Sequence, residues 1–421
     1  MKKQAWVIAV DMGYGHQRTA YPLRNLAFEG KIINANSYEG ITEKDRAIWA
    51  KAKAGYEFIS AFRRTPLIGK IVFGSFDKLQ RILSFYPRRD LSEPNLQIKQ
   101  TMAPIKKGWG RHLIKKLSEK PLPFIGTFFT AVFMAEHFHY PGEIYCVVCD
   151  TDISRTWAPL KPQKSKIKYF APTERVVGRL KLYGVKPENI FLTGYPLPQE
   201  NIGSEKMEVL KEDLKRRLVN LDPQKRYFKN YRELIELKLG KLPKKSDHPL
   251  TIMFAVGGAG AQKEIGVGVA KALAKKIKVG EVKVILVAGI REGIRDYFEK
   301  NTKDLPVEII FAQDMTSYFQ QFNENLRKTD ILWTKPSELS FYSALGIPII
   351  IAPPIGSQED FNQRWLLNSG FGFLQRNPGY INQWLFDWLN QGYLAEAAMQ
   401  GFIEGKKLGT FNIKKIISQN E

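Results

Sequence analysis

Residues 251–262 read TIMFAVGGAGAQ, an apolar run that leads directly into a glycine-rich loop. The run has the length and composition of a strand that is covered on both faces of a parallel sheet. Glycines let a ligand approach the backbone, and the amides of a following helix start favour an anion. The stretch therefore predicts a diphosphate site formed by Gly257, Gly258, Gly260, Ala261 and Gln262. A tight strand-to-helix turn that binds no ligand is the alternative.

A similar pattern occurs near the start of the chain. An apolar run at 4–10 ends in DMGYGH at 11–16, and a helix is expected from Gln17. A histidine at the carboxyl end of the first strand of a parallel sheet faces the ligand crevice. Because imidazole titrates near neutral pH, it can accept a proton from an attacking hydroxyl or donate one to a phosphate. His16 is therefore a candidate catalytic base, although this residue taken alone favours a helix-capping or packing histidine.

Apolar runs alternate with helical segments along most of the chain. Strands are predicted at 4–10, 145–148, 168–170 and 190–192, and then at 251–256, 282–288, 307–311, 331–333 and 347–351. Such alternation favours parallel sheets that carry helices on both faces. The sequence therefore predicts two Rossmann-like α/β domains that face each other across a cleft.

Changes in composition place the domain boundaries. Residues 1–200 form the first predicted domain and residues 250–375 the second. The intervening segment 201–249 is helical, charged and poor in strand signals, so we interpret it as a linker with an insertion. Residues 376–421 are expected to form C-terminal helices that pack back toward the first domain.

Polar side chains follow several of the predicted strands. Asp150 and Asp152 end a strand of the first domain, where a carboxylate can act as a base or orient an acceptor. Residues that cap a turn are the alternative interpretation of this pair.

In the second domain, Lys335 follows one predicted strand, and Gln358, Glu359 and Asn362 follow another. Amide and carboxylate side chains together offer the donors and acceptors that adjacent sugar hydroxyls require. A helix start that is simply rich in acids is the alternative.

Cysteine and histidine spacing argues against redox and metal chemistry. Cys146 and Cys149 have CxxC spacing but lie along an apolar strand, which favours buried thiols over a redox pair. Two cysteines in 421 residues fit a reducing compartment, and no signal peptide is predicted. No spacing among the remaining histidines specifies a metal site, so we predict no metal.

The charge balance is strongly basic. The 64 Lys and Arg residues against 42 Asp and Glu give a net charge of +22, which predicts attraction to a polyanion such as an anionic membrane or a phosphorylated ligand. No recognised nucleic-acid motif is present, and no apolar stretch approaches the roughly 20 residues that span a bilayer. Within 56–120, apolar residues at helical spacing are flanked by basic and aromatic side chains, which favours an interfacial membrane helix over a core helix. The predicted membrane residues are Arg63, Arg64, Lys70, Phe73, Lys78 and Arg81.

The order of these motifs resembles that of the GT-B glycosyltransferases. The chain is most similar to the monogalactosyldiacylglycerol synthase and processive diacylglycerol glucosyltransferase group, and more distantly to the peptidoglycan lipid-intermediate N-acetylglucosaminyltransferase. The resemblance covers most of the chain outside 205–245. It rests on the segments at 11–16, 168–174, 183–196, 257–262, 334–336 and 356–362.

The resemblance implies transfer of a sugar from a nucleotide sugar, usually UDP-linked, to a lipid acceptor such as diacylglycerol. It implies a metal-independent enzyme at the cytoplasmic face of the membrane, with no cofactor beyond the nucleotide sugar. The family's catalytic histidine and strand-end aspartate fall on His16 and Asp150. Its acceptor loop falls on Gly13, Tyr14 and Gly15, and its diphosphate loop on Gly257, Gly258 and Gly260. Its sugar-contacting residues fall on Gln358 and Glu359, with Asn362 beside them.

The chain departs from the family at several positions. The second glycine of the family's Lys-Pro-Gly-Gly segment is Glu338 here, and a histidine shortly before Trp157 is replaced by Ser154. Where relatives carry a glutamate that holds the ribose hydroxyls, this sequence has Ser343 or Phe341, depending on a short gap. Two alternatives therefore remain beside the glycosyltransferase. One is a non-hydrolysing nucleotide-sugar epimerase on the same fold, and the other is a non-catalytic relative that binds a membrane or polyanion.

Overall fold

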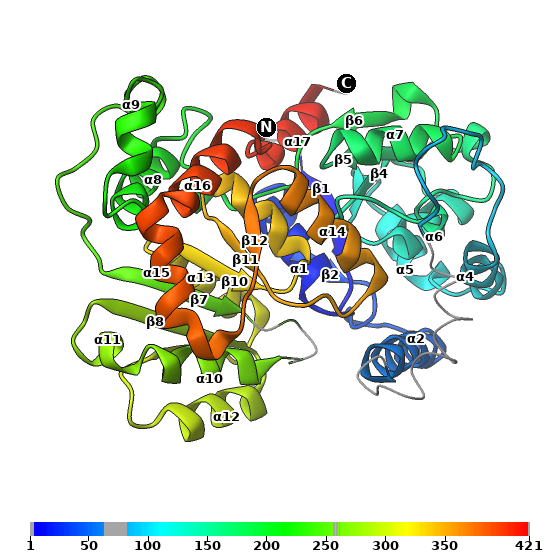
Figure 1. The fold of residues 1–421 in the computed structure, drawn as a ribbon. Coiled ribbons are helices and arrows are strands. Elements are labelled where there is room, and N and C mark those ends of the chain that lie inside the picture. Colours follow the sequence, from blue (N-terminus) through cyan, green and yellow to red (C-terminus); the bar gives the residue numbers. More distant parts are fainter. Residues whose placement is uncertain (1–3, 63–81, 256, 258–259, 261, 420–421) are drawn as a thin grey trace. The chain divides into compact units, whose positions relative to one another are not determined.

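The computed structural model describes residues 4–62, 82–255, 257, 260 and 262–419. The chain divides into two compact units. The first contains residues 1–196, 355–362 and 408–421, and the second contains residues 197–354 and 363–407. Each unit is built on one six-stranded sheet in which all neighbouring strands are parallel (Figure 1). This confirms the prediction of two Rossmann-like α/β units.

The sheet of the first unit has the strand order β2-β1-β3-β4-β5-β6. Its order reverses between β1 and β3, and ligands of open parallel sheets bind at the carboxyl ends of strands at such a switch point. The strand bounds are β1 Ala5–Ala9, β2 Ala27–Asn34, β3 Phe124–Gly126, β4 Ile144–Val147, β5 Lys168–Ala171 and β6 Ile190–Leu192.

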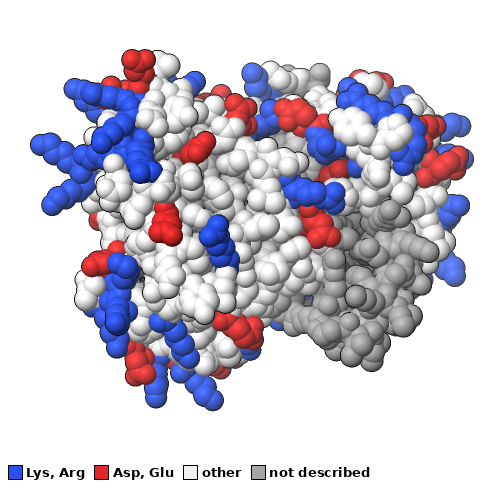
Figure 2. Space-filling model, in the orientation of Figure 1, with Lys and Arg blue, Asp and Glu red and all other residues white. Residues whose placement is uncertain are grey.

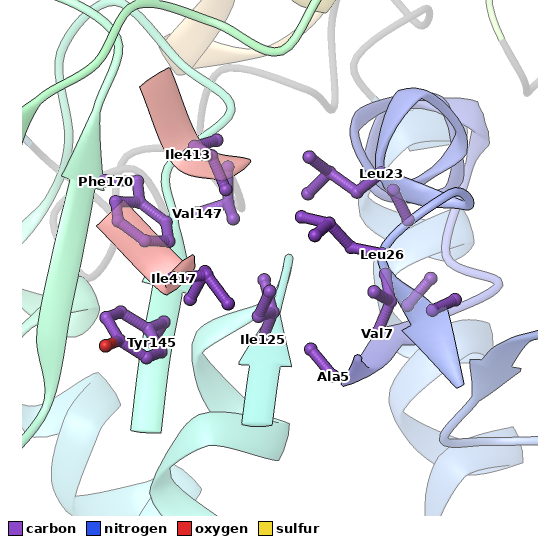
Figure 3. Close-up of a cluster of buried hydrophobic side chains, with 13 residues drawn as sticks. Ala5, Val7, Leu23, Leu26, Ile125, Tyr145, Val147, Phe170, Ile413 and Ile417 are labelled. Carbon is purple, nitrogen blue, oxygen red and sulfur yellow. The ribbon is translucent and has the colours of Figure 1, made fainter. Parts of the chain in front are cut away.

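Apolar side chains from β1 to β5 form a core beneath the C-terminal helix of the chain. Helix α17 (Gly409–Gln419) places Ile413 and Ile417 against Tyr145 and Phe170 of the sheet (Figure 3). The two aromatic rings are stacked, with centroids 5.0 Å apart. The last helix of the sequence is therefore an integral part of the first unit.

Further helices complete the first unit: α1 Tyr14–Ala20, α2 Glu43–Phe62, α4 Leu96–Lys106, α5 Arg111–Ser118, α6 Phe129–His137 and α7 Glu174–Leu182. The predicted membrane residues, from Arg63 to Arg81, lie outside the described residues. In the part of the chain that is described, no helix has the length and apolarity needed to cross a bilayer.

The sheet of the second unit has the strand order β12-β11-β10-β7-β8-β9, and its switch point lies between β7 and β10. The strand bounds are β7 Leu250–Ala255, β8 Val282–Gly289, β9 Glu308–Phe311, β10 Ile331–Thr334, β11 Ile349–Ile351 and β12 Gly372–Leu374. Every residue of β7 is buried, as the apolar run predicts.

Helices surround this second sheet. They are α8 Glu208–Leu221, α9 Arg226–Leu239, α10 Lys263–Ala272, α11 Ala274–Lys278, α12 Glu292–Thr302, α13 Met315–Leu326, α15 Ile381–Gln391 and α16 Tyr393–Glu404. Helix α14 (Ser357–Asn368) begins in the first unit and ends in the second.

The segment interpreted as a linker with an insertion contributes α8 and α9 to the second unit. Arg217 of α8 is buried, and its guanidinium donates hydrogen bonds to the carbonyls of Thr329, Leu345 and Gly346. Its third guanidinium nitrogen, Nη2, donates to the carbonyl of Leu326, so each nitrogen meets a backbone acceptor and these bonds offset the cost of burying the charge.

Candidate functional site

The switch point of the first unit carries His16. Strand β1 ends at Ala9, and the chain turns through Gly13 (φ 101°, ψ 171°) into α1, where His16 is the third residue. Only glycine adopts this backbone conformation without strain. The turn therefore brings the half-buried imidazole to the end of β1, beside the start of the segment that follows β3.

One ring nitrogen of His16 is held by that segment. Its Nδ1 lies 2.8 Å from the carbonyl oxygen of Thr127, and the hydroxyl of Thr127 donates to the carbonyl of His16 at 2.9 Å. A carbonyl can only accept, so Nδ1 carries the proton and Nε2 of the neutral ring carries the lone pair. The ring also packs on Phe128, with centroids 4.6 Å apart. These contacts fix both the tautomer and the orientation that a base needs.

The thiols are buried, as the sequence predicts. Cys146 and Cys149 are reduced thiols, and burial raises the pKa of Cys146 well above its usual range. The Sγ of Cys149 lies 3.5 Å from Nδ1 of His16, so this side chain also borders the imidazole. Because burial raises its pKa, the Cys146 thiol is a poor nucleophile at neutral pH.

Asp150 is oriented by an amide side chain from α14. Buried Asn362 accepts hydrogen bonds from the amide and hydroxyl of Thr151, at 3.0 and 2.7 Å, and its Nδ2 donates to Asp150 Oδ1 at 3.4 Å. Asn362 therefore reaches the carboxyl end of β4, and its side-chain oxygen is already committed to Thr151. Asp150 and His16 both follow strands of one parallel sheet, at the edge where such sheets bind ligands.

Asp152 has a structural role. Its two carboxylate oxygens accept from Nε and Nη2 of Arg179, each at 2.8 Å, and both side chains are buried. The bond between Arg179 Nη1 and the carbonyl of Leu83 extends this network. Of the two strand-end aspartates, the half-buried Asp150 is the one that stays a catalytic candidate.

The predicted acceptor loop is bonded to two neighbouring elements. The side chain of Asn36, just after β2, exchanges hydrogen bonds with the amide and carbonyl of Asp11 at 3.0 and 3.2 Å. Lys53 of α2 forms an ion pair with the carboxylate of Asp11 at 2.8 Å. Tyr14 is buried, and the carbonyl of Gly15 accepts from the hydroxyl of Thr19. Asn36, Lys53 and Thr127 were not singled out from the sequence because nothing local links them to the loop.

The switch point of the second unit carries Gly257 and Lys335. Gly257 follows β7 and Lys335 follows β10, and these two strands are neighbours. A Cβ atom at Gly257 would lie 2.3 Å from Cε of Lys335. The lysine stem thus crosses the bare backbone of the glycine-rich loop, which brings a cation to the predicted diphosphate site.

The rest of the glycine-rich loop ends at the start of α10. Gly260 has a φ of 66°, and its amide donates to the carbonyl of Gly257 at 2.7 Å. Gln262 precedes α10 and donates to the carbonyl of Pro353 at 2.8 Å. Gly258 and Ala261 lie outside the described residues. The described part of the loop has the strand–turn–helix context in which backbone amides bind an anion.

The residue that replaces the ribose-binding glutamate of the family that this chain resembles is buried. Phe341 is buried and packs on Trp365, while Ser343 is buried and its hydroxyl donates to the carbonyl of Ser340. Both belong to a 3₁₀ helix, η6 (Glu338–Leu345), in which residues three apart lie on the same face. Glu338 is half-buried and lies one turn before Phe341 on that face.

The predicted sugar-contacting pair lies at the start of α14. One carboxylate oxygen of Glu359 accepts from the amide of Ile355 at 2.6 Å, so this side chain also caps the turn into the helix. Gln358 is half-buried. No group of three or more His, Cys, Asp and Glu side chains suited to a metal ion occurs among the described residues.

The chain has no match among protein-family models or curated proteins. Among solved structures, it is similar to MurG from Acinetobacter baumannii, with 13% identity and a TM-score of 0.47 over 99% of both chains. It is also similar to the UDP-GlcNAc 2-epimerase from Neisseria meningitidis bound to UDP-GlcNAc, with 14% identity and a TM-score of 0.45 over 78% of this chain and 83% of that one. The UDP-GlcNAc 2-epimerase from Methanocaldococcus jannaschii gives 12% identity and a TM-score of 0.42 over 99% of both chains. Similarities at this level carry no inference about function.

Proposed function

We propose that this protein is a GT-B glycosyltransferase that moves a sugar from a UDP-sugar to a lipid acceptor such as diacylglycerol at the cytoplasmic face of a membrane. In this proposal the first unit binds the acceptor and the second binds the donor. The observation that carries it is the hydrogen bond from His16 Nδ1 to the carbonyl of Thr127, because it leaves Nε2 as a proton acceptor at the switch point of the sheet.

The proposed chemistry is a displacement at the anomeric carbon. His16 Nε2 takes the proton of the acceptor hydroxyl, the acceptor oxygen forms a bond to the sugar carbon, and the bond from that carbon to the diphosphate oxygen breaks. Asp150, oriented by Asn362, is the rival base. A positioned general base contributes about 10²- to 10⁴-fold to the rate of such a step.

The second unit supports departure of the nucleoside diphosphate. Negative charge develops on the leaving diphosphate, and Lys335 with the backbone amides before α10 would stabilise that charge. Glu338, the half-buried first residue of η6, is the carboxylate that we assign to the ribose hydroxyls in place of the buried Phe341.

The test measures nucleotide binding first and turnover second. UDP, GDP, dTDP and ADP are compared in a thermal-shift screen, where a ligand at 100 times its dissociation constant adds about 2.7 kcal/mol of stability. Release of UDP from UDP-sugars is then measured with and without diacylglycerol in micelles. The His16→Ala variant is compared with His112→Ala, which changes an exposed histidine of the same unit.

The proposal expects stabilisation by UDP, acceptor-dependent turnover, and loss of turnover only in His16→Ala with the UDP shift retained. Interconversion of UDP-GlcNAc without acceptor, followed by NMR, would instead identify an epimerase. A chain that no nucleotide stabilises is not a glycosyltransferase of this kind.

A further inference from the structure

Two hollows adjoin each other along α7 of the first unit. One has a volume of about 520 Å³ and the other about 580 Å³, and both are lined by Arg88, Lys181 and Leu182. Volumes of this size suit a small molecule or a headgroup. The hollows involve neither the His16 site nor the residues assigned to donor binding.

Hydrogen bonds hold the segment that forms one wall of the hollows. The amide of Leu91 donates to the carbonyl of Leu182 at 2.9 Å, and Arg179 donates to the carbonyl of Leu83. Buried Arg155 donates twice to the carbonyl of Ser92, at 2.9 and 2.7 Å. The segment 83–92 is thus tied at both ends, so the hollows are formed before any ligand binds, which lowers the entropy cost of binding.

Aromatic rings form one side of the hollows. Phe85 packs on the bare backbone of Gly178, where an added Cβ would come within 2.8 Å of the ring. The side chain of Tyr86 is 64% exposed. The guanidinium of Arg175 lies 4.0 Å from the centroid of the Phe85 ring, and that of Arg88 lies 5.6 Å from it. Both guanidinium groups thus lie within the range of a cation–π interaction with this ring.

The lining carries an excess of positive charge. Four cations, Arg88, Arg89, Arg175 and Lys181, line the hollows beside two acids, Asp90 and Glu174. In the described part of the chain, Arg88, Arg175 and Lys181 form no ion pair with a carboxylate. Asp90 instead accepts a hydrogen bond from the amide of Ser92. Figure 2 shows Lys and Arg atoms around a patch of uncharged atoms at the upper right, over α7.

We propose that these hollows bind a phosphate-bearing ligand through Arg88, Arg175 and Lys181, with an apolar part of the ligand against Phe85 and Tyr86. Planar guanidinium groups match the oxygens of a phosphate, and a lysine adds a further charge-assisted hydrogen bond. The ligand is either a free phosphorylated molecule or the headgroup of an anionic phospholipid, since both present the same chemistry. The proposal does not depend on the proposed function.

The test compares the two sources. Inorganic phosphate and glycerol 3-phosphate are titrated in calorimetry, and vesicles of phosphatidylcholine with and without phosphatidylglycerol are used in sedimentation. The test variant carries Arg88→Gln, Arg175→Gln and Lys181→Gln. The control carries Lys229→Gln, Lys244→Gln and Lys245→Gln, which removes the same charge from exposed positions of the second unit.

The test variant is expected to bind about tenfold more weakly or worse, while the control binds like the unmodified protein. Binding of the soluble phosphates that only the test variant loses identifies a small-molecule site. Loss confined to phosphatidylglycerol vesicles identifies a headgroup site. The proposal is overturned if no probe binds, or if both variants lose binding equally, because the charge then acts without a defined site.

A second variant distinguishes the loss of probe binding from a general loss of structure. Arg88→Gln with Lys181→Gln leaves Arg175 on the Phe85 ring, and both changed side chains are exposed. This variant should keep the melting temperature of the unmodified protein, yet still bind the probe more weakly. Unchanged probe binding in this variant would overturn the assignment of Arg88 and Lys181.

Discussion

Replacing Gly257 with alanine tests how the second unit binds a diphosphate. The new methyl group would lie 2.3 Å from Cε and 3.1 Å from Cδ of Lys335. These atoms belong to a flexible stem, so the lysine should move while the backbone stays in place. The Gly257→Ala protein is therefore expected to keep its fold and to lose the position of one cation.

The expected loss of UDP affinity is that of one hydrogen bond between the Lys335 ammonium and the diphosphate. A hydrogen bond to a charged group contributes about 1.5–3 kcal/mol. Each 1.4 kcal/mol is tenfold in the dissociation constant, so UDP should bind about 10- to 150-fold more weakly. Unfolding by urea should change little, because no cavity, buried charge or strained backbone is introduced.

Calorimetry with UDP measures the effect in Gly257→Ala, Lys335→Ala and the double variant. Gly293→Ala is the matched control, since Gly293 lies in α12 of the same unit with open space where its Cβ would be. In the double variant the alanine should add no further loss, because the lysine that it displaces is already gone. The reasoning is refuted if Gly257→Ala binds UDP within about twofold of the unmodified protein, or if it weakens binding equally without the lysine.

Three further outcomes are expected. His16→Ala should lower turnover about 10²- to 10⁴-fold and leave UDP affinity unchanged; a parallel fall in affinity would contradict a role as base. Asp152→Ala should destabilise the first unit by about 3–5 kcal/mol, measured by hydrogen exchange of its amides, because buried Arg179 keeps its charge and loses its partner; a loss below about 1 kcal/mol would argue against this. Burial lowers the pKa of His248, but hydrogen bonds to Asp330 and Asp247 outweigh burial and raise it. The charged form of His248 therefore stabilises the fold. This stabilisation is complete below about pH 6.5 and is lost as the pH rises through the raised pKa, so the free energy of unfolding of His248→Gln in urea should depend less on pH.

Much of the sheet architecture could be predicted from local sequence. The runs that became β1, β4 to β11 are apolar over several residues, as strands covered on both faces must be. Strands β2, β3 and β12 were not predicted. Strand β2 carries exposed Glu29, Gly30 and Lys31, and the short strands β3 and β12 each contain a glycine (Gly126 and Gly372) that leaves only two apolar side chains, so none of them has a clear apolar pattern.

The candidate site could be predicted only in part. His16 and Gly257 stand out because each follows an apolar run and lies in a glycine-rich turn. Thr127 and the bond from Asn362 to Asp150 carry no such signal, since their partners lie 111 and 212 residues away along the chain. The hollows along α7 likewise depend on a segment about 90 residues earlier, which reaches the helix through backbone hydrogen bonds.

The sequence by itself determined the α/β class, the two series of strands and the loops that end them, because periodicity and turn chemistry act over a few residues. Tertiary structure decided the strand order, and with it which strand ends meet at each switch point. It also decided which nitrogen of His16 holds the proton, and that Asp152 is bound to Arg179 while Asp150 borders the site. These outcomes depend on contacts between separate segments of the chain, and such contacts exist only once the sheet that carries those segments has formed.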